Sequence, residues 1–174
     1  MSKTIVYIDV DGVINSFNEY RQTTGWLGEW KKEKVGKYWI HWYTDLVEEL
    51  NKLSKMENVE VKWLTTWQDK AASDLSPALG IEGQFWDVLY HDPSAGEHLF
   101  YRHNGWWKLN AIIRDVAIHK PEKIVWIDDD FKEELIAIDW AEHVGNVLPI
   151  SPFMDAGMTK EDFSDIIEFI NTPS

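Results

Sequence analysis

Three short apolar runs, each followed by acidic or hydroxyl side chains, constrain the fold of this 174-residue chain most strongly. They cover 4–9, 59–64 and 123–127, and each is rich in β-branched and aromatic residues. Runs of this length and composition are typical of buried strands. Two shorter stretches, 85–90 and 146–150, are candidates for further strands.

Helical patterns lie between these runs, over 45–55, 68–79, 106–118, 131–142 and 160–170. Thr44 is expected to cap the first helix, and Thr159 and Asp162 have capping-box spacing at the last one. Strands that alternate with helices predict an α/β fold, a Rossmann-like three-layer sandwich with a central parallel sheet covered on both faces. We expect residues 1–174 to form a single domain.

Residues 15–42 interrupt the alternation soon after the first run. Gly25, Gly28, Gly36 and many aromatic residues in this segment predict a small β-hairpin flap over the edge of the sheet. Residues 91–105 form a second irregular stretch. Loops of this length in a compact domain are commonly lids or binding loops.

Side chains that follow the strands are the candidates for chemistry, because ligands bind at the carboxyl ends of parallel strands. Asp9 and Asp11 come at the end of the first run, and Gly12 lets the backbone turn sharply after them. One such carboxylate can attack phosphorus while the other exchanges a proton with the leaving oxygen. An acidic turn or a helix cap would explain the same residues without chemistry.

Thr65 and Thr66 follow the second run and offer hydroxyl groups to a phosphate. Because Thr66 and Asp69 have capping-box spacing, we assign Thr66 to a helix cap and Thr65 to the ligand, although threonine is a common cap in any protein. Lys108 lies in the first turn of a predicted helix, where a cation opposes the helix dipole unless an anion lies in front of it. An exposed lysine without a function is the alternative.

Asp128, Asp129 and Asp130 follow the third run. Adjacent carboxylates repel one another unless a cation lies among them, and oxygen-only ligands suit Mg²⁺. Asp130 and Glu133 have capping-box spacing, so Asp128 and Asp129 are the better metal candidates.

Composition narrows the class of protein. The chain has no cysteine, which excludes disulfides, thiolate metal sites and a cysteine nucleophile. Its net charge of −13 opposes binding to nucleic acid or anionic membranes, apart from one cationic cluster made of Lys31, Lys32, Lys34 and Lys37. No apolar run is long enough to span a membrane. We therefore expect a cytoplasmic protein with no membrane contact and no obligate protein partner.

Taken in chain order, the clusters resemble the four motifs of the haloacid-dehalogenase (HAD) superfamily. The matching residues are Asp9, Asp11, Thr65, Lys108, Asp128 and Asp129. The stretches 63–67, 126–130 and 157–162 look more narrowly like a small bacterial and phage branch that is grouped with predicted RNA-repair proteins.

The resemblance implies a Mg²⁺-dependent phosphatase. Asp9 would attack the phosphoryl group and form an aspartyl phosphate, while Asp11 would protonate the leaving group and then activate water. Thr65 and Lys108 would hold the phosphoryl oxygens. The implied metal ligands are Asp9, the main-chain carbonyl of Asp11, Asp128 and Asp129.

Several alternatives stay open at this point. A small flap would admit a nucleic-acid end as the phosphorylated substrate, whereas the net charge of −13 favours small esters such as nucleotides. An alcohol that replaced water in the second step would make the protein a phosphotransferase. A catalytically idle HAD-like binding module is the third possibility, and the intact set of motif residues argues against it.

Overall fold

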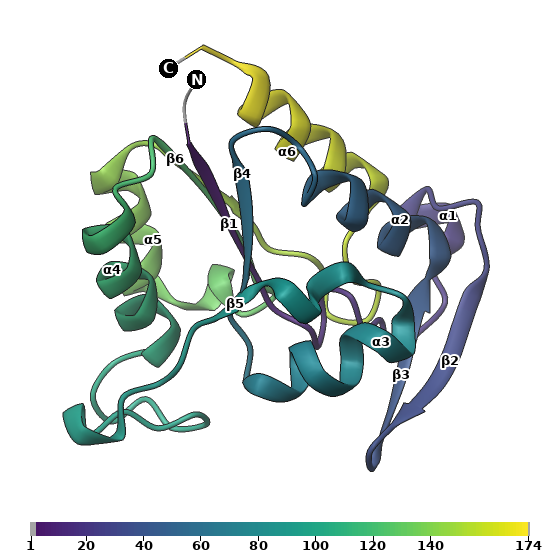
Figure 1. Ribbon diagram of the computed structural model, residues 1–174, viewed down its shortest axis with the longest axis horizontal. Coiled ribbons are helices and arrows are strands. Elements are labelled where there is room, and N and C mark those ends of the chain that lie inside the picture. Colours follow the sequence, from purple (N-terminus) through teal and green to yellow (C-terminus); the bar gives the residue numbers. More distant parts are fainter. Residues whose placement is uncertain (1–2, 174) are drawn as a thin grey trace.

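The computed structural model describes residues 3–173, and a five-stranded parallel sheet lies at its centre (Figure 1). The strand order is β5-β4-β1-β6-β7. The strands are β1 (Thr4–Ile8), β4 (Val59–Trp63), β5 (Asp87–Val88), β6 (Lys123–Ile127) and β7 (Val147–Ile150). All five predicted strands are present, and only β5 is markedly shorter than its apolar run.

Helices cover both faces of this sheet, which confirms the predicted three-layer α/β fold (Figure 1). One face carries α4 (Trp107–His119) and α5 (Leu135–Val144). The other carries α2 (Thr44–Leu53), α3 (Ser76–Leu79) and α6 (Lys160–Asn171).

The period-two alternation of β1 explains why two separate cores form. Val6 and Ile8 pack into the core under α2, α3 and α6, whereas Ile5 and Tyr7 pack into the core under α4 and α5. All four side chains are fully buried, as expected for a central strand covered on both faces.

The register of the central strands places their last residues level with one another. Ile8 pairs with Trp63 of β4 on one side and with Ile127 of β6 on the other. The polar residues that follow these three strands therefore emerge at the same edge of the sheet, which is where the sequence placed the site.

The segment after β1 contains a two-stranded antiparallel hairpin, β2 (Trp30–Val35) and β3 (Tyr38–Tyr43), preceded by the one-turn helix α1 (Arg21–Thr24). Gly36 in the turn has a φ of 61°, a conformation that glycine adopts without strain. Ile40 and Trp42 are buried against the main core, so the hairpin is anchored to the sheet domain.

Predicted caps succeed at one helix and fail at others. Thr159 and Asp162 form the reciprocal capping box at α6, with nitrogen-to-oxygen distances of 2.7 and 3.0 Å. The prediction for Thr44 is wrong, because this residue is already inside α2 and its hydroxyl accepts a hydrogen bond from the Glu29 N–H. The hydroxyl oxygen that could have capped the helix is therefore bonded to the main chain just before β2.

The helix predicted over 131–142 begins later than expected. Phe131–Glu133 form a single 3₁₀ turn and α5 starts at Leu135. The Asp130 side chain makes no cap, because it faces Arg102 at 3.4 Å.

The helix predicted over 68–79 also differs. A wide helical turn, Ala71–Leu75, precedes α3, and the helix ends at Gly80 as the sequence indicates. The predicted Thr66 cap with Asp69 is wrong, since the Asp69 carboxylate accepts a hydrogen bond from the Tyr90 hydroxyl instead. Within residues 3–173, no helix is both long enough and apolar enough to cross a membrane.

Candidate active site

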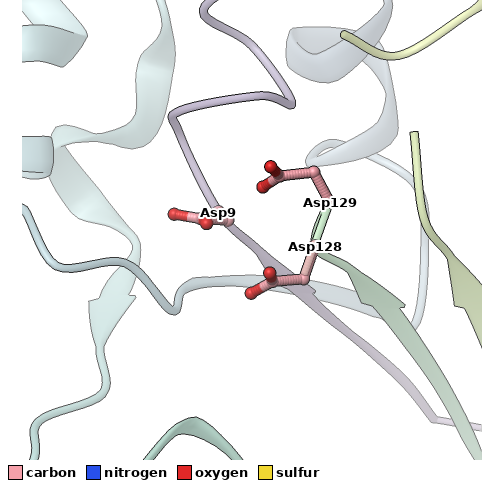
Figure 2. Close-up of side chains that lie close together, drawn as sticks. All are labelled: Asp9, Asp128 and Asp129. Atoms are coloured by element: carbon pink, nitrogen blue, oxygen red, sulfur yellow. The ribbon is translucent and has the colours of Figure 1, made fainter. Parts of the chain in front are cut away.

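Three carboxylates meet at the carboxyl edge of the sheet (Figure 2). Asp9 follows β1, and Asp128 and Asp129 follow β6. One oxygen from each of the three side chains lies within 4.8 Å of the others. Asp9 and Asp128 are buried and Asp129 is partly exposed, so the cluster opens to solvent on the Asp129 side.

Lys108 is the cation of this cluster. It comes from the first turn of α4 and is itself buried. Its Nζ donates to Asp9 Oδ2 at 2.6 Å and to Asp128 Oδ2 at 2.5 Å. The ammonium thus lies between carboxylates of two neighbouring strands and offsets part of the repulsion expected among them.

Burial and charge shift the ionisation of these groups in a consistent direction. Burial lowers the pKa of Lys108, but the attraction of Asp128 and Asp9 outweighs it and holds the pKa above its usual value. Burial, together with the negative charge of Asp9, raises the pKa of Asp128 against the opposing effect of Lys108. Burial, then Asp9 and then Asp130, raises the pKa of Asp129 to about 7. Asp128 and Asp129 therefore keep their protons to a higher pH than ordinary carboxyl groups, because Lys108 alone does not offset burial and the neighbouring negative charge.

Gly12 lets the chain pass closely over the cluster. Its φ is +73°, and a Cβ atom there would collide with the carboxylate of Asp129. A larger residue there would both strain the backbone and force the Asp129 carboxylate to move, a stronger constraint than the sharp turn inferred from sequence.

Asp11 lies apart from the three carboxylates. Its Oδ1 accepts a hydrogen bond from Asn15 Nδ2 at 2.8 Å, and its Oδ2 accepts one from Trp67 Nε1 at 3.0 Å. Asn15 also accepts a hydrogen bond from the His41 N–H of β3 at 2.9 Å. The Asp11 side chain is therefore fixed by the turn after β4 and, through Asn15, by the hairpin.

The two threonines differ in their exposure. Thr65 is fully buried and its hydroxyl accepts a hydrogen bond from the Trp67 N–H at 3.3 Å, which leaves its own proton available as a donor. Thr66 is the threonine that lines the open space of the site. From the sequence, Thr65 was predicted to contact the ligand and Thr66 to cap a helix.

A cavity of about 320 Å³ adjoins the cluster, and Asp9, Asp11, Lys108 and Asp129 all line it. Its outer wall contains Arg102, Phe100 and Trp106, which the sequence had not singled out as site residues. The irregular length of the 91–105 stretch was the available signal for the first two. Asp128 does not line the cavity, but it is hydrogen-bonded to Lys108, which does.

The donor set suits a hard divalent cation. The cluster presents carboxylate oxygens and contains no sulfur or imidazole ligand, which favours Mg²⁺ over a transition metal. Asp9, Asp128 and Asp129 are the side chains placed to hold it. The Asp11 side chain is turned to Trp67 and Asn15, so its share in a metal site would come from its main chain.

A family model described as "HAD domain in Swiss Army Knife RNA repair proteins" matches residues 5–163 of the chain. This match confirms the resemblance to HAD domains and to their RNA-repair branch. No curated protein matches the chain.

Proposed function

The chain belongs to this family of HAD domains, whose members are generally phosphatase-type hydrolases, and we propose that it is a Mg²⁺-dependent phosphomonoesterase. The observation that carries the proposal is the Lys108 ammonium between the Asp9 and Asp128 carboxylates, beside Asp129 and an open cavity. We treat residues 1–174 as one catalytic domain and residues 15–42 as its flap.

Asp9 is the nucleophile in this proposal. Its carboxylate attacks phosphorus, the bond from phosphorus to the ester oxygen breaks, and an aspartyl phosphate forms. Asp11 donates the proton that the leaving oxygen needs. Its carboxylate is aimed by two N–H donors from Trp67 and Asn15, which supports a role in which position matters.

The second step releases phosphate. Asp11 takes a proton from a water molecule, the water oxygen attacks phosphorus, and the bond from phosphorus to Asp9 breaks. In this proposal the phosphoryl oxygens are held in both steps by Lys108, which lines the cavity, and by the hydroxyl of Thr65, which is buried at the same sheet edge next to the cavity-lining Thr66.

A bound Mg²⁺ would neutralise charge on the phosphoryl group. Asp9, Asp128, Asp129 and the main-chain carbonyl of Asp11 would hold it. Nucleotides and polynucleotide ends are the proposed substrates, and the family description favours the second.

Phosphate release tests this function directly. We expect Mg²⁺-dependent release from mononucleotides or from 5′- or 3′-phosphorylated oligonucleotides, and its loss in Asp9→Asn, which keeps the size of the side chain and removes the attacking charge. Asp139→Asn is the matched control, because Asp139 is exposed on α5 away from the site. Release that persisted in Asp9→Asn would show that Asp9 is not the nucleophile. Transfer of phosphate to an added alcohol instead of water would identify a phosphotransferase.

A further inference from the structure

A second cavity, of about 540 Å³, adjoins the catalytic one. Asp11, Thr66 and Phe100 line both cavities, so the two spaces meet at the proposed acid/base residue. We call the second cavity the aromatic groove, after Tyr38, Trp67 and Phe100, which line it. Both volumes fall in the range of about 300–1,000 Å³ that is typical of small-molecule sites.

The three aromatic residues come from segments far apart in the sequence. Tyr38 belongs to β3 of the hairpin, Trp67 to the turn after β4, and Phe100 to the 91–105 stretch. The Tyr38 and Trp67 rings meet edge to face, with centroids 5.4 Å apart. Tyr38 and Phe100 remain exposed, although apolar rings at the mouth of a site gain free energy only when something covers them.

The polar side chains of the groove are largely engaged with the protein itself. Asp11 accepts from Trp67 and Asn15, and Asp69 accepts from the Tyr90 hydroxyl. The Gln68 amide donates to the Thr65 carbonyl at 3.0 Å. A ligand rich in hydroxyl groups would find few free partners there, whereas a flat aromatic ligand would find ring faces and edges.

We propose that the aromatic groove binds the nucleobase of a nucleotide whose phosphate lies against Asp9. The proposal rests on the phosphatase function above and extends it to the part of the substrate that does not react. A nucleotide carries a phosphate and a flat base joined by a sugar, which matches a catalytic cavity joined to a groove of aromatic side chains. Every base presents a π-face, so stacking of this kind accepts several bases.

The charge at the rim of the aromatic groove bears on whether the base belongs to a mononucleotide or to a polynucleotide end. The chain has a net charge of −13, which opposes binding of a long polyanion. Lys70, on the rim of the groove, forms no ion pair with any residue between 3 and 173, so it is free to meet a neighbouring phosphate. A polynucleotide end would use Lys70, and a mononucleotide would not need it.

The main comparison in the test is between a substrate that carries a base and one that lacks it. Phosphate release with Mg²⁺ is measured from adenosine 5′-monophosphate and from ribose 5-phosphate, with adenosine 3′-monophosphate and a short 5′-phosphorylated oligonucleotide alongside. We expect the wild type to prefer the nucleotide to ribose 5-phosphate by about tenfold or more in kcat/KM, the size of effect that one stacked base contributes. Tyr38→Ala and Phe100→Ala should reduce that preference several-fold.

The chain offers a matched control for each variant. Trp39 neighbours Tyr38, and Tyr101 neighbours Phe100, and within the described residues neither control lines either cavity. Trp39 and Tyr38 are both 53% exposed, while Tyr101 and Phe100 are 60% and 67% exposed. Trp39→Ala and Tyr101→Ala should keep the preference of the wild type.

Each outcome separates the two proposals. If no ester is hydrolysed by the wild type, the phosphatase function fails, and groove-dependent binding of adenosine 5′-monophosphate to Asp9→Asn becomes the remaining test of the groove. If hydrolysis occurs but ribose 5-phosphate is as good a substrate as the nucleotide, or if the groove variants behave like their controls, the nucleobase site is refuted. A preference for the oligonucleotide that Lys70→Ala removes supports a polynucleotide end, and a preference for the nucleotide that Lys70→Ala leaves intact supports a mononucleotide.

Discussion

Replacing Lys108 with methionine tests whether the buried ammonium holds the site together. Methionine is unbranched and similar in length, so Lys108→Met removes the charge and keeps much of the packing. The Nζ atom donates to Asp9 at 2.6 Å and to Asp128 at 2.5 Å, and Asp129 lies in the same cluster. The variant leaves these carboxylates close together without a cation.

The expected cost is large. Removing one partner of a buried ion pair typically lowers the free energy of unfolding by about 3–5 kcal/mol, because the other charge stays buried and uncompensated. In a domain of 150–250 residues, a change of 1 kcal/mol shifts Tm by roughly 2–4 °C, so the loss corresponds to roughly 6–20 °C. Because the pKa values of Asp128 and Asp129 are raised even with Lys108 present, protonation of these carboxylates will recover part of this loss, and more of it as the pH falls.

Thermal and urea unfolding at pH 7.5, with EDTA or with excess Mg²⁺, measure the effect. If the cluster binds Mg²⁺, the ion replaces the missing positive charge and should raise the Tm of Lys108→Met by more than that of the wild type. Lys62→Met is the matched control. Lys62 is just as buried and pairs with Asp115 at 3.0 Å, away from the three carboxylates. Its variant should be destabilised too, but without a larger response to Mg²⁺.

Two results would refute this reasoning. A free energy of unfolding within about 1 kcal/mol of the wild type would mean that the carboxylates of Asp9 and Asp128 are satisfied without Lys108. An equal Mg²⁺ response in Lys108→Met and Lys62→Met would mean that the ion acts elsewhere on the acidic surface.

Three further perturbations have defined outcomes. Gly12→Ala should lower the free energy of unfolding by roughly 1–3 kcal/mol or more and weaken Mg²⁺ binding, because it adds a collision with Asp129 to backbone strain. Gly36→Ala is the control, since Gly36 has a similar φ and open space around it, and urea unfolding of this variant should show the effect of strain alone. Trp67→Phe keeps an aromatic side chain but removes the indole N–H that aims Asp11, so kcat for phosphate release should fall roughly tenfold with a smaller change in KM. Burial and neighbouring charge raise the pKa of Asp129 to about 7, well above the unfolded value of about 4, so the native state holds a proton that the unfolded chain has lost. Metal-free stability should therefore fall as the pH rises from about 4 to 7, and urea unfolding of Asp129→Asn across this range should show a weaker dependence.

The strands and the location of the site were predictable from local composition. Runs of β-branched residues have few alternatives to a buried strand, and a parallel sheet brings the ends of β1, β4 and β6 to one edge whatever the loops do. Asp9 and Asp128 were therefore expected at the same edge, and the pairing of β1 with β6 in the structure brings them close together. The covering helices follow from the same alternation of elements.

Details that depend on tertiary partners were not predictable in this way. The Thr44 hydroxyl accepts a hydrogen bond from the Glu29 N–H just before β2, and the Asp69 carboxylate accepts one from the Tyr90 hydroxyl, although both residues have the local pattern of a cap. A side chain with one hydrogen-bonding oxygen can serve a helix end or a neighbouring segment, and sequence spacing does not say which is closer. Thr159 and Asp162, which have no such competitor among residues 3–173, form the box that their spacing predicts.

The position of Lys108 illustrates a second limit. Sequence order alone suggested a lysine that faces the substrate, yet its Nζ lies between two carboxylates of the site itself. An ammonium in this position can act both when the site is empty and when substrate is bound. Without substrate it offsets the repulsion among the carboxylates, and a phosphoryl group at Asp9 would lie within reach of the same ammonium. The helix-dipole cost of a cation in the first turn of α4 is a few tenths of a kcal/mol, small beside the charge that it balances.

Trp67 connects the proposed chemistry with the proposed recognition. Its indole N–H donates to Asp11, and the same ring forms one wall of the aromatic groove against Tyr38. A base that stacks in the groove therefore packs beside the side chain that orients the acid/base carboxylate. Asn15 donates to the other oxygen of Asp11 and accepts a hydrogen bond from the main chain of β3. Both hydrogen bonds on the Asp11 carboxylate therefore depend on elements that line the groove. The same few contacts thus bind the base of a nucleotide and align Asp11. In this way the binding energy of the base can be used to raise the rate of phosphate release.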